Sequence, residues 1–269
     1  MIKAAVLGSP ISHSLSPLLH KRAYELLNIE ASYEALDVAP QGAEDFFRKA
    51  LEGDWTGFSL TMPLKETVVN LGSKFGFEID PIVQLMKSGN TMHRKGETFH
   101  ISSTDRTGFL RLFEGVDCAK TLIIGGGGTA RAALSALDGH AEKVDFLLRS
   151  PSRQETLLQI ARQSTVGFFP MDHSLIGYDL VISTVPAGVT DAMSEALTSA
   201  IPTFCEVLYN PFPTKLLERA RSLGSSTIDG IDLLVEQALD QIALFSGVEF
   251  EYTMMRDELQ RVARTHLNS

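Results

Sequence analysis

The chain has little of what marks secreted, membrane-spanning or metal-binding proteins. Its two cysteines, Cys118 and Cys205, lie far apart and show neither CxxC nor Cys/His ligand spacing. This pattern predicts buried free thiols in a reducing cytoplasm and no metal site. No apolar run approaches the roughly 18 residues of a membrane span, and the N-terminal apolar run is too short for a signal peptide.

Positive charge is also scarce. The formal net charge is −9 and the pI is near 5.3, whereas general nucleic-acid binding needs a concentrated basic face. Hydrophobic residues make up 44% and charged residues 21% of the 269 residues, which is typical of a globular protein with one large or two ordinary domains. We therefore expect a cytoplasmic protein that binds a small molecule and neither nucleic acid nor membrane.

The most informative stretch is 121–137, TLIIGGGGTARAALSAL, in which strand-forming residues run into glycines and then into an alanine-rich segment suited to a helix. Gly125, Gly127 and Ala130 satisfy the dinucleotide fingerprint. The first glycine permits the turn, the second lets the backbone approach a pyrophosphate, and the alanine lets the helix pack on the strand. The N–H groups at the start of the helix favour phosphate. A purely structural glycine turn is the alternative.

The next predicted strand, 144–148, indicates which nucleotide would bind. Folds that bind NAD place an acidic residue for the ribose about 20 residues past the glycines. Here the segment 149–153 has the sequence RSPSR, with two guanidiniums, two hydroxyls and no carboxylate. Arginine forms charge-assisted hydrogen bonds with a 2′-phosphate, so the segment favours NADP over NAD. A solvated basic loop is the alternative.

Polar clusters follow the predicted strands of the N-terminal part. After the strand 3–7, Ser16 is a suitable N-cap and Pro17 a suitable first residue for the helix 18–27, and the hydroxyls nearby could form a small anion site. After the strand 57–61, Thr61 and Lys65 bracket the first turn of another helix. Ligands collect at such strand ends, although a lysine there is more often merely solvated.

A second polar group lies around a predicted hairpin. The segment 88–91 contains Asn90, and the chain returns through 99–101 to Asp105, which precedes a helix at 108–113. Asp105 could be an N-cap, or it could pair with Lys65. A lysine with a carboxylate partner can act as a proton carrier.

The motifs SHSLSP, TMPLK, GNT, STD and GGGGTARA, in this order, make the chain similar to the shikimate dehydrogenase family, and the later YNP and GxxxLVxQ segments extend the resemblance over nearly the whole chain. The sequence departs from the family at three positions. Ser59 and Ser103 stand where the family usually has Asn, and Leu148 replaces the Asn of its NRT motif.

The resemblance implies an α/β fold with a substrate domain, residues 1–105 and 237–269, and a Rossmann-type NADP-binding domain, residues 106–236, with an active-site cleft between them. It implies reversible NADP-dependent oxidation of shikimate to 3-dehydroshikimate in aromatic amino-acid (chorismate) biosynthesis. Lys65 and Asp105 would be the catalytic pair. The substrate would be bound by Ser14, Ser16, Thr61, Asn90, Tyr209 and Gln237. The cofactor would be bound by Gly125, Gly126, Gly127, Gly128, Thr129, Ala130, Arg149, Ser150, Arg153, Thr184, Val207 and Gly230.

Two alternatives stay open from the sequence. A quinate or dual quinate/shikimate dehydrogenase could arise through small changes around Ser59 and Ser103. A regulatory protein could bind NADP on the same fold without catalysis. A homodimer is also left open, because the sequence does not indicate the oligomeric state.

Overall fold

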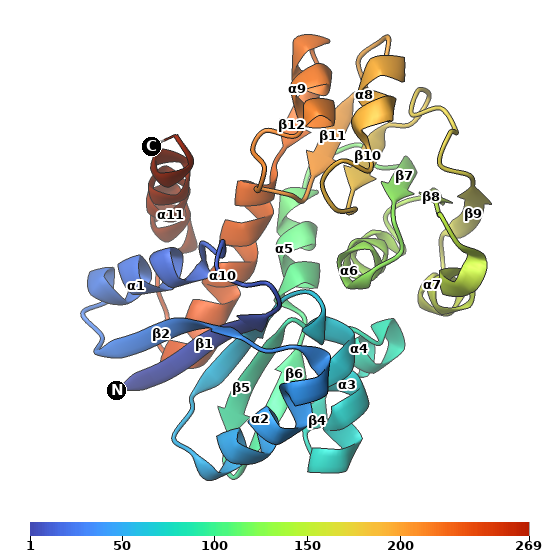
Figure 1. Ribbon diagram of the computed structural model, residues 1–269. Helices are drawn as coiled ribbons and strands as arrows, with labels where there is room; N and C mark the ends of the chain where they lie inside the picture. The colour runs from blue at the N-terminus through green and yellow to red at the C-terminus, as the bar shows by residue number, and fades with distance from the viewer. Residues whose placement is uncertain (269) are drawn as a thin grey trace. The chain divides into compact units, whose positions relative to one another are not determined.

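The computed structural model describes residues 1–268 and divides into two compact units (Figure 1). Unit 1 comprises Met1–Thr107 and Leu234–Ser269, and unit 2 comprises Gly108–Leu233. Each unit contains one six-stranded sheet, so the predicted α/β class is confirmed. Residue 269, the end of the predicted substrate domain, lies outside the described residues. The functional roles assigned to the two predicted domains stay predictions.

The sheet of unit 1 has the order β2-β1-β3-β5-β6-β4. The strand β1 pairs in parallel with β2 and β3, β5 is antiparallel to β3 and β6, and β4 is parallel to β6. The predicted hairpin is therefore confirmed as β5 and β6. The strands are β1 (Ile2–Gly8), β2 (Ala31–Asp37), β3 (Gly57–Leu60), β4 (Glu78–Ile79), β5 (Thr91–Lys95) and β6 (Thr98–Ser102).

Helices cover both faces of this sheet. The helices α2 (Pro40–Glu52), α3 (Leu64–Phe75) and α4 (Pro81–Met86) lie on one face, and α1 (Ser16–Leu26), α10 (Gly230–Ser246) and α11 (Tyr252–Leu267) belong to the other (Figure 1). Under α2, the fully buried rings of Phe47, Phe58 and Phe99 belong to one aromatic cluster. Burying such a ring contributes about 1.5–3 kcal/mol, which makes this sheet a rigid support.

The sheet of unit 2 is entirely parallel, with the order β12-β11-β10-β7-β8-β9. This is the doubly wound order of a Rossmann-type fold, with its switch point between β7 and β10. The helices α6 and α7 lie on one face and α8 and α9 on the other (Figure 1). The elements are β7 (Lys120–Ile124), α6 (Gly128–Leu137), β8 (Lys143–Leu147), η1 (Pro151–Arg153), α7 (Gln154–Ile160), β9 (Thr165–Phe169), β10 (Leu180–Ser183), α8 (Asp191–Ala196), β11 (Thr203–Glu206), α9 (Lys215–Ser222) and β12 (Ser226–Ile228).

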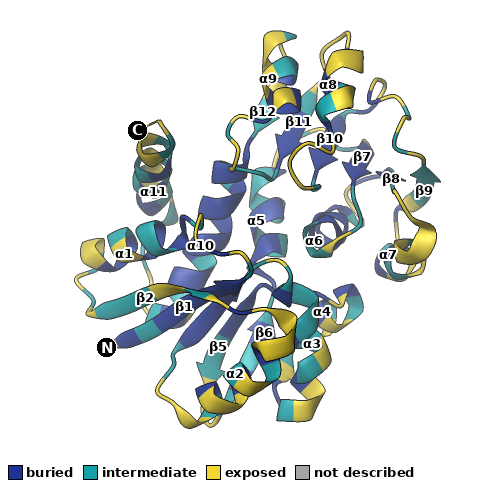
Figure 2. Ribbon diagram, in the orientation of Figure 1, coloured by how far each residue is buried: buried dark blue, intermediate teal, exposed yellow. Residues whose placement is uncertain are grey.

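One face of the long helix α10 is apolar and buried. It consists of Leu234, Ala238, Ile242 and Phe245, and Gly247 stops the helix with a φ of 67°. Figure 2 shows the central strands of each sheet and α10 mostly buried, whereas β2 and β9 are only partly buried and the outer sides of the surrounding helices are exposed. The helix α11 packs on α1 within unit 1, and Arg22 pairs with Glu258 at 2.7 Å.

Several predicted boundaries were wrong. The helix α5 (Thr104–Leu112) begins before Asp105 and not at 108. The helices α4, α8 and α9 were missed, because their short apolar patterns do not stand out from loops. Cys205 is a buried free thiol as predicted, but Cys118 is only partly buried, because it lies in the loop between α5 and β7.

The first helix was misplaced by one residue. Ser16 was predicted as the N-cap, yet α1 begins at Ser16, and Leu15 occupies the cap position with helical dihedral angles. The N–H of Ser16 donates to Ser14 Oγ at 3.3 Å. Ser14 Oγ therefore serves as the hydrogen-bond acceptor at the start of α1. Among the described residues, no helix combines the length and apolar character needed to cross a bilayer.

Candidate functional site

In unit 1 three chain segments meet at the end of the sheet where β1 and β3 terminate. The N–H of Thr61 donates to Leu7 O at 2.9 Å, the N–H of Ser9 donates to Met62 O at 3.2 Å, and the N–H of Leu60 donates to Asn90 O at 2.7 Å. The carboxyl ends of β1 and β3 thus lie beside the start of β5. This arrangement gathers the polar clusters that the sequence places after separate strands.

Lys65 and Asp105 form an ion pair at this edge. Lys65 Nζ lies 2.6 Å from Asp105 Oδ2, and the two side chains are 17% and 8% exposed. The sequence offered this pairing as one of two possibilities for Asp105. Removing charges from water costs free energy unless they are paired and hydrogen-bonded, so each side chain depends on the other.

The buried side chain of Asn90 orients the carboxylate. Its Oδ1 accepts from the backbone N–H groups of Thr104 at 2.7 Å and Asp105 at 3.3 Å. Its Nδ2 donates to Thr104 Oγ1 at 2.9 Å and to Asp105 Oδ1 at 3.1 Å. Asp105 is thus held on both sides, with Oδ1 toward Asn90 and Oδ2 toward Lys65.

The alternative that Asp105 is simply an N-cap is wrong. Asp105 lies inside the first turn of α5, and the N–H of Arg106 donates to Ser103 Oγ at 3.3 Å. Ser103 supplies the acceptor that a helix start requires. The serine that departs from the family motif therefore has a structural function here, and the carboxylate of Asp105 is left to interact with Lys65 and Asn90.

The structure brings most of the predicted substrate residues into unit 1, and one lies in unit 2. Gln237 Oε1 lies 3.3 Å from Asn90 Nδ2. Ser14 and Ser16 lie at the start of α1, and Thr61 lies at the end of β3, where its methyl group closely approaches Gly8. Tyr209 lies in unit 2, in the segment after β11.

The glycine loop of unit 2 joins β7 to α6 as predicted. Gly125 has a φ of 108°, and a Cβ there would lie 2.6 Å from Thr184 Oγ1. A Cβ on Gly127, the residue before α6, would meet no atom within 4 Å. The first glycine is therefore required by the turn, whereas the space beside the second is open. Ala130 is fully buried, as packing of α6 on the sheet requires.

The basic loop lies beside the glycine loop. A Cβ on Gly126 would lie 3.0 Å from Leu148 Cδ2 and 3.1 Å from Arg153 Cβ. Arg149 and Arg153 are exposed, and Ser150 Oγ accepts from the N–H of Ser152 at 3.4 Å. An exposed pair of arginines beside the start of α6 fits a phosphorylated dinucleotide through its charge and its hydrogen-bond donors.

The predicted residues Val207, Tyr209 and Gly230 form a third group. A Cβ on Gly230 would lie 2.4 Å from the carbonyl of Leu208, so glycine allows α10 to begin against this segment. Glu206, near this group, was not among the residues that the sequence analysis singled out. It is fully buried, and its carboxylate accepts hydrogen bonds from Thr214 Oγ1 at 2.9 Å and from the N–H of Leu208 at 3.2 Å. Burial raises the pKa of the Glu206 carboxyl.

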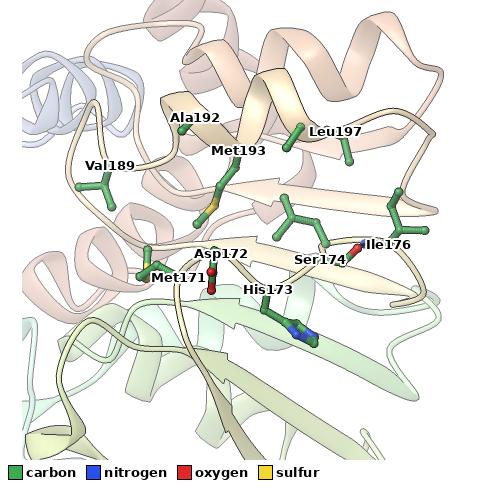
Figure 3. Close-up of a pocket in the computed structure, with 11 residues that line it drawn as sticks. Met171, Asp172, His173, Ser174, Ile176, Val189, Ala192, Met193 and Leu197 are labelled. Carbon is green, nitrogen blue, oxygen red and sulfur yellow. Dashed lines mark hydrogen bonds between the residues drawn. The ribbon is translucent and has the colours of Figure 1, made fainter.

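A separate pocket of about 540 Å³ lies in unit 2, between α8 and the segment that follows β9 (Figure 3). Met171, Val189 and Met193 make its wall largely apolar, and His173 lies at one side (Figure 3). The ring of His173 stacks on Phe169 with centroids 4.2 Å apart. The residues that line this pocket do not include the predicted catalytic, substrate or cofactor residues.

The fold and the site define the class. A parallel, doubly wound sheet with an open glycine loop is typical of nicotinamide-dependent oxidoreductases, and the second unit contributes a partly buried lysine–aspartate pair. Residues 6–91 match the family described as the shikimate dehydrogenase substrate binding domain. The protein named shikimate dehydrogenase (NADP(+)) of Exiguobacterium sibiricum is 32% identical over 249 residues, which cover 90% of this chain and 92% of that protein. The chain belongs to the shikimate dehydrogenase family.

Solved structures agree with this membership. The crystal structure of Mycobacterium tuberculosis shikimate dehydrogenase has a TM-score of 0.84 at 28% identity and covers 97% of this chain and 100% of that chain. A Thermus thermophilus shikimate 5-dehydrogenase in complex with NADP(H) and shikimate has a TM-score of 0.83 at 26% identity, with the same coverage of both chains. The predicted family and its two-domain fold are therefore confirmed.

Proposed function

We propose that the protein catalyses the reversible NADP-dependent oxidation of shikimate to 3-dehydroshikimate, a step of aromatic amino-acid (chorismate) biosynthesis. The observation that carries this proposal is the partly buried pair of Lys65 and Asp105, whose Nζ and Oδ2 lie 2.6 Å apart. It occurs in a chain 32% identical to a shikimate dehydrogenase (NADP(+)) over 90% of its length. The pair supplies the proton transfer that oxidation of an alcohol requires.

In this proposal unit 1 binds the substrate. The hydroxyls of Ser14 and Ser16, together with the first N–H groups of α1, suit the carboxylate of shikimate, because a helix N-terminus has unpaired donors and favours negative charge. Thr61, Asn90 and Gln237 hold the substrate hydroxyls. Tyr209 is the substrate contact proposed for unit 2.

The chemistry needs a hydride acceptor and a proton acceptor. Bound NADP would supply the hydride acceptor. The proton of the substrate hydroxyl is taken by Lys65 and Asp105 acting together, because Lys65 Nζ lies within hydrogen-bond distance of Asp105 Oδ2. Asn90 keeps Oδ1 of Asp105 occupied, which leaves Oδ2 to orient the lysine amine.

Unit 2 binds NADP in this proposal. The open space beside Gly127 and the start of α6 at Gly128 support contact of the pyrophosphate with the backbone of the fingerprint residues 125–130. Arg149, Ser150 and Arg153 bind the 2′-phosphate. Thr184, Val207 and Gly230 lie at the ends of β10 and β11 and at the start of α10, and they would contact the nicotinamide side.

The direct test is the absorbance of reduced cofactor when the purified protein meets shikimate or quinate with NADP or NAD. We expect shikimate with NADP to give the highest kcat/KM. A higher kcat/KM with quinate would support the quinate dehydrogenase alternative. Absence of turnover on both acids would overturn the proposed activity and favour a regulatory NADP-binding protein.

Arg149→Ala tests the cofactor assignment. Hydrogen bonds to charged groups contribute about 1.5–3 kcal/mol, so the dissociation constant of NADP should rise roughly 10- to 100-fold while that of NAD stays unchanged. Fluorescence titration with the reduced cofactors measures both constants. Arg162→Ala, which removes an exposed arginine beyond α7, is the matched control. Equal weakening of both cofactors would contradict the assignment.

We further propose that the protein works in the cytoplasm, consistent with its two free cysteines. A homodimer is the assembly to be tested. Light scattering coupled to size-exclusion chromatography distinguishes a monomer of 29.4 kDa from a dimer.

A further inference from the structure

A group of polar residues extends the hydrogen-bond network of Lys65 and Asp105 into the interior of unit 1. Its members are Tyr33, Ser59, Thr91 and Gln241, and the last three are nearly or fully buried. Tyr33 OH donates to Ser59 Oγ at 2.6 Å, and Ser59 Oγ donates to Gln241 Oε1 at 2.7 Å. Gln241 Nε2 donates to Thr91 Oγ1 at 2.9 Å and to Asn90 O at 3.3 Å.

The backbone carbonyl of Asn90 decides the direction of these hydrogen bonds. A carbonyl oxygen only accepts, so the end of the Gln241 amide that faces it must be the NH₂ group. The amide oxygen then faces Ser59, whose hydroxyl must donate to it. Ser59 consequently uses its oxygen to accept from Tyr33. The Gln241 amide, in this orientation, therefore provides hydrogen-bond partners for buried groups on β3 and β5.

The network continues from Gln241 to the ion pair. Thr91 Oγ1 lies 2.9 Å from Thr104 Oγ1, and Thr104 Oγ1 accepts from Asn90 Nδ2 at 2.9 Å. Asn90 also donates to Asp105 Oδ1 at 3.1 Å. Gln241 thus binds the backbone of Asn90 directly and reaches, through Thr91, the hydroxyl that helps to hold the Asn90 side chain.

We propose that Gln241 is a positioning residue for the Lys65–Asp105 pair, acting through Asn90 and Thr104. The inference rests on the proposed function and adds to it a residue that lies one helical turn beyond Gln237 on α10. Ser59 and Tyr33 fix the side-chain rotamer of Gln241 and belong to the same hydrogen-bond network. Burial lowers the pKa of His20, which stacks on Tyr33 with ring centroids 3.9 Å apart, to about 3. This histidine is therefore neutral wherever the enzyme is assayed near neutral pH.

Gln241→Leu is the first test. Leucine fills similar space but removes the hydrogen bonds of the amide to Ser59, Thr91 and the Asn90 carbonyl, which keeps only the N–H of Leu60, so the segment that holds Asp105 should shift. A misplacement of about 1 Å in a catalytic group can cost about 100-fold, and we expect kcat with shikimate to fall roughly 10- to 100-fold. The dissociation constant of NADP should stay unchanged. Leu239→Ala, a cavity variant on the same helix, is the control for lost stability.

The pH dependence of Gln241→Glu activity distinguishes a positioning role from a purely structural one. The protonated carboxyl has one O–H that can donate to Thr91 or to the Asn90 carbonyl, whereas the ionised form has no donor. Burial raises the pKa of the introduced carboxyl. The activity of this variant relative to the unsubstituted protein should therefore increase as the pH falls, while the relative activity of Gln241→Leu should not depend on pH. A flat ratio for Gln241→Glu, or unchanged kcat for both variants, overturns the proposal.

A crystal structure of Gln241→Leu separates this proposal from the proposed function, because it needs no turnover. We expect the Asn90 side chain to leave Asp105 Oδ1. An Asn90–Asp105 hydrogen bond at its present 3.1 Å in the variant would overturn the positioning role, whether or not the protein oxidises shikimate. Lack of activity in the unsubstituted protein would overturn only the proposed function.

Discussion

The lysine and the aspartate at the site have different supports. Asp105 is held by hydrogen bonds from Asn90, and the residues before it are fixed by the Ser103 cap. Lys65 lies in the first turn of α3, and its backbone carbonyl accepts from the N–H of Gly89 at 2.9 Å. The carboxylate is thus preorganised, and the flexible amine approaches it. Such an arrangement suits a group that must gain and lose a proton without moving its partner.

Lys65→Ala should lower kcat on shikimate by roughly 10²- to 10⁴-fold, the range for losing acid–base help. The dissociation constant of NADP should change little. Lys74→Ala is the control, since Lys74 lies on the same helix but is 56% exposed and pairs with Glu44. Steady-state kinetics and cofactor titration check the result, and wild-type turnover in Lys65→Ala would remove the role given to this lysine.

His20 should make stability depend on pH. Its pKa is lowered by burial from 6.5 to about 3, so the unfolded chain binds more protons than the folded chain between these values. The contribution to stability is complete above about 6.5 and is lost as the pH falls, by at most about 1.4 kcal/mol per pH unit. Denaturant unfolding at several pH values should show a weaker acid dependence for His20→Phe. His140→Phe, at an exposed site, should retain the dependence of the unsubstituted protein.

The residues of the candidate site lie at the ends of strands and helices. The strands β1 and β3 end beside the start of β5, and α5 and α10 bring Asp105 and Gln237 to the same group of side chains. Unit 2 repeats the principle, because the loops after β7, β8 and β10 meet at the switch point of the sheet. The fingerprint glycines within this arrangement have separate functions.

Substitution of the glycines should separate folding from cofactor binding. Gly125→Ala combines a φ of 108° with a contact of 2.6 Å to Thr184 Oγ1, so it should lower the Tm by several degrees. Gly127→Ala meets no atom within 4 Å and should fold with nearly unchanged Tm. If Gly127 contacts the pyrophosphate as proposed, the added methyl group would take up space needed there, and NADP should bind at least about tenfold more weakly. Calorimetry and titration distinguish the two effects. Tight NADP binding by Gly127→Ala would contradict the assignment of the loop.

The molecule as a whole has two sheets of different construction, one mixed and one parallel. We propose that they divide the ligands between them. Hydrogen exchange with each ligand alone tests this division, because bound groups lower the opening of nearby backbone. Shikimate should protect amides at 14–19 and 90–105, and NADP should protect amides at 125–130 and 149–153. Protection of the second set by shikimate alone would contradict the division.

Consecutive residues were sufficient to predict the features whose physical requirements are local. The turn at Gly125, the open backbone at Gly127 and the basic residues after β8 follow from local conformation and charge, and they indicated the nucleotide fold and NADP. Short helices such as α4 and α8 were not predicted from the sequence, because their few apolar residues form no recognisable pattern before they pack against the rest of the fold.

The folded arrangement was needed to establish which polar residues form hydrogen bonds with one another. Lys65 and Asp105 are 40 residues apart, and Ser59 and Gln241 are 182 apart. Their hydrogen bonds depend on sheet order and on the return of α10 to unit 1, which leave no periodic signal in the chain. The i, i+4 spacing of Gln237 and Gln241 was the one local hint, since residues one helical turn apart share a face. A helix pattern shows that two amides share a face, but not which buried carbonyl one of them will meet.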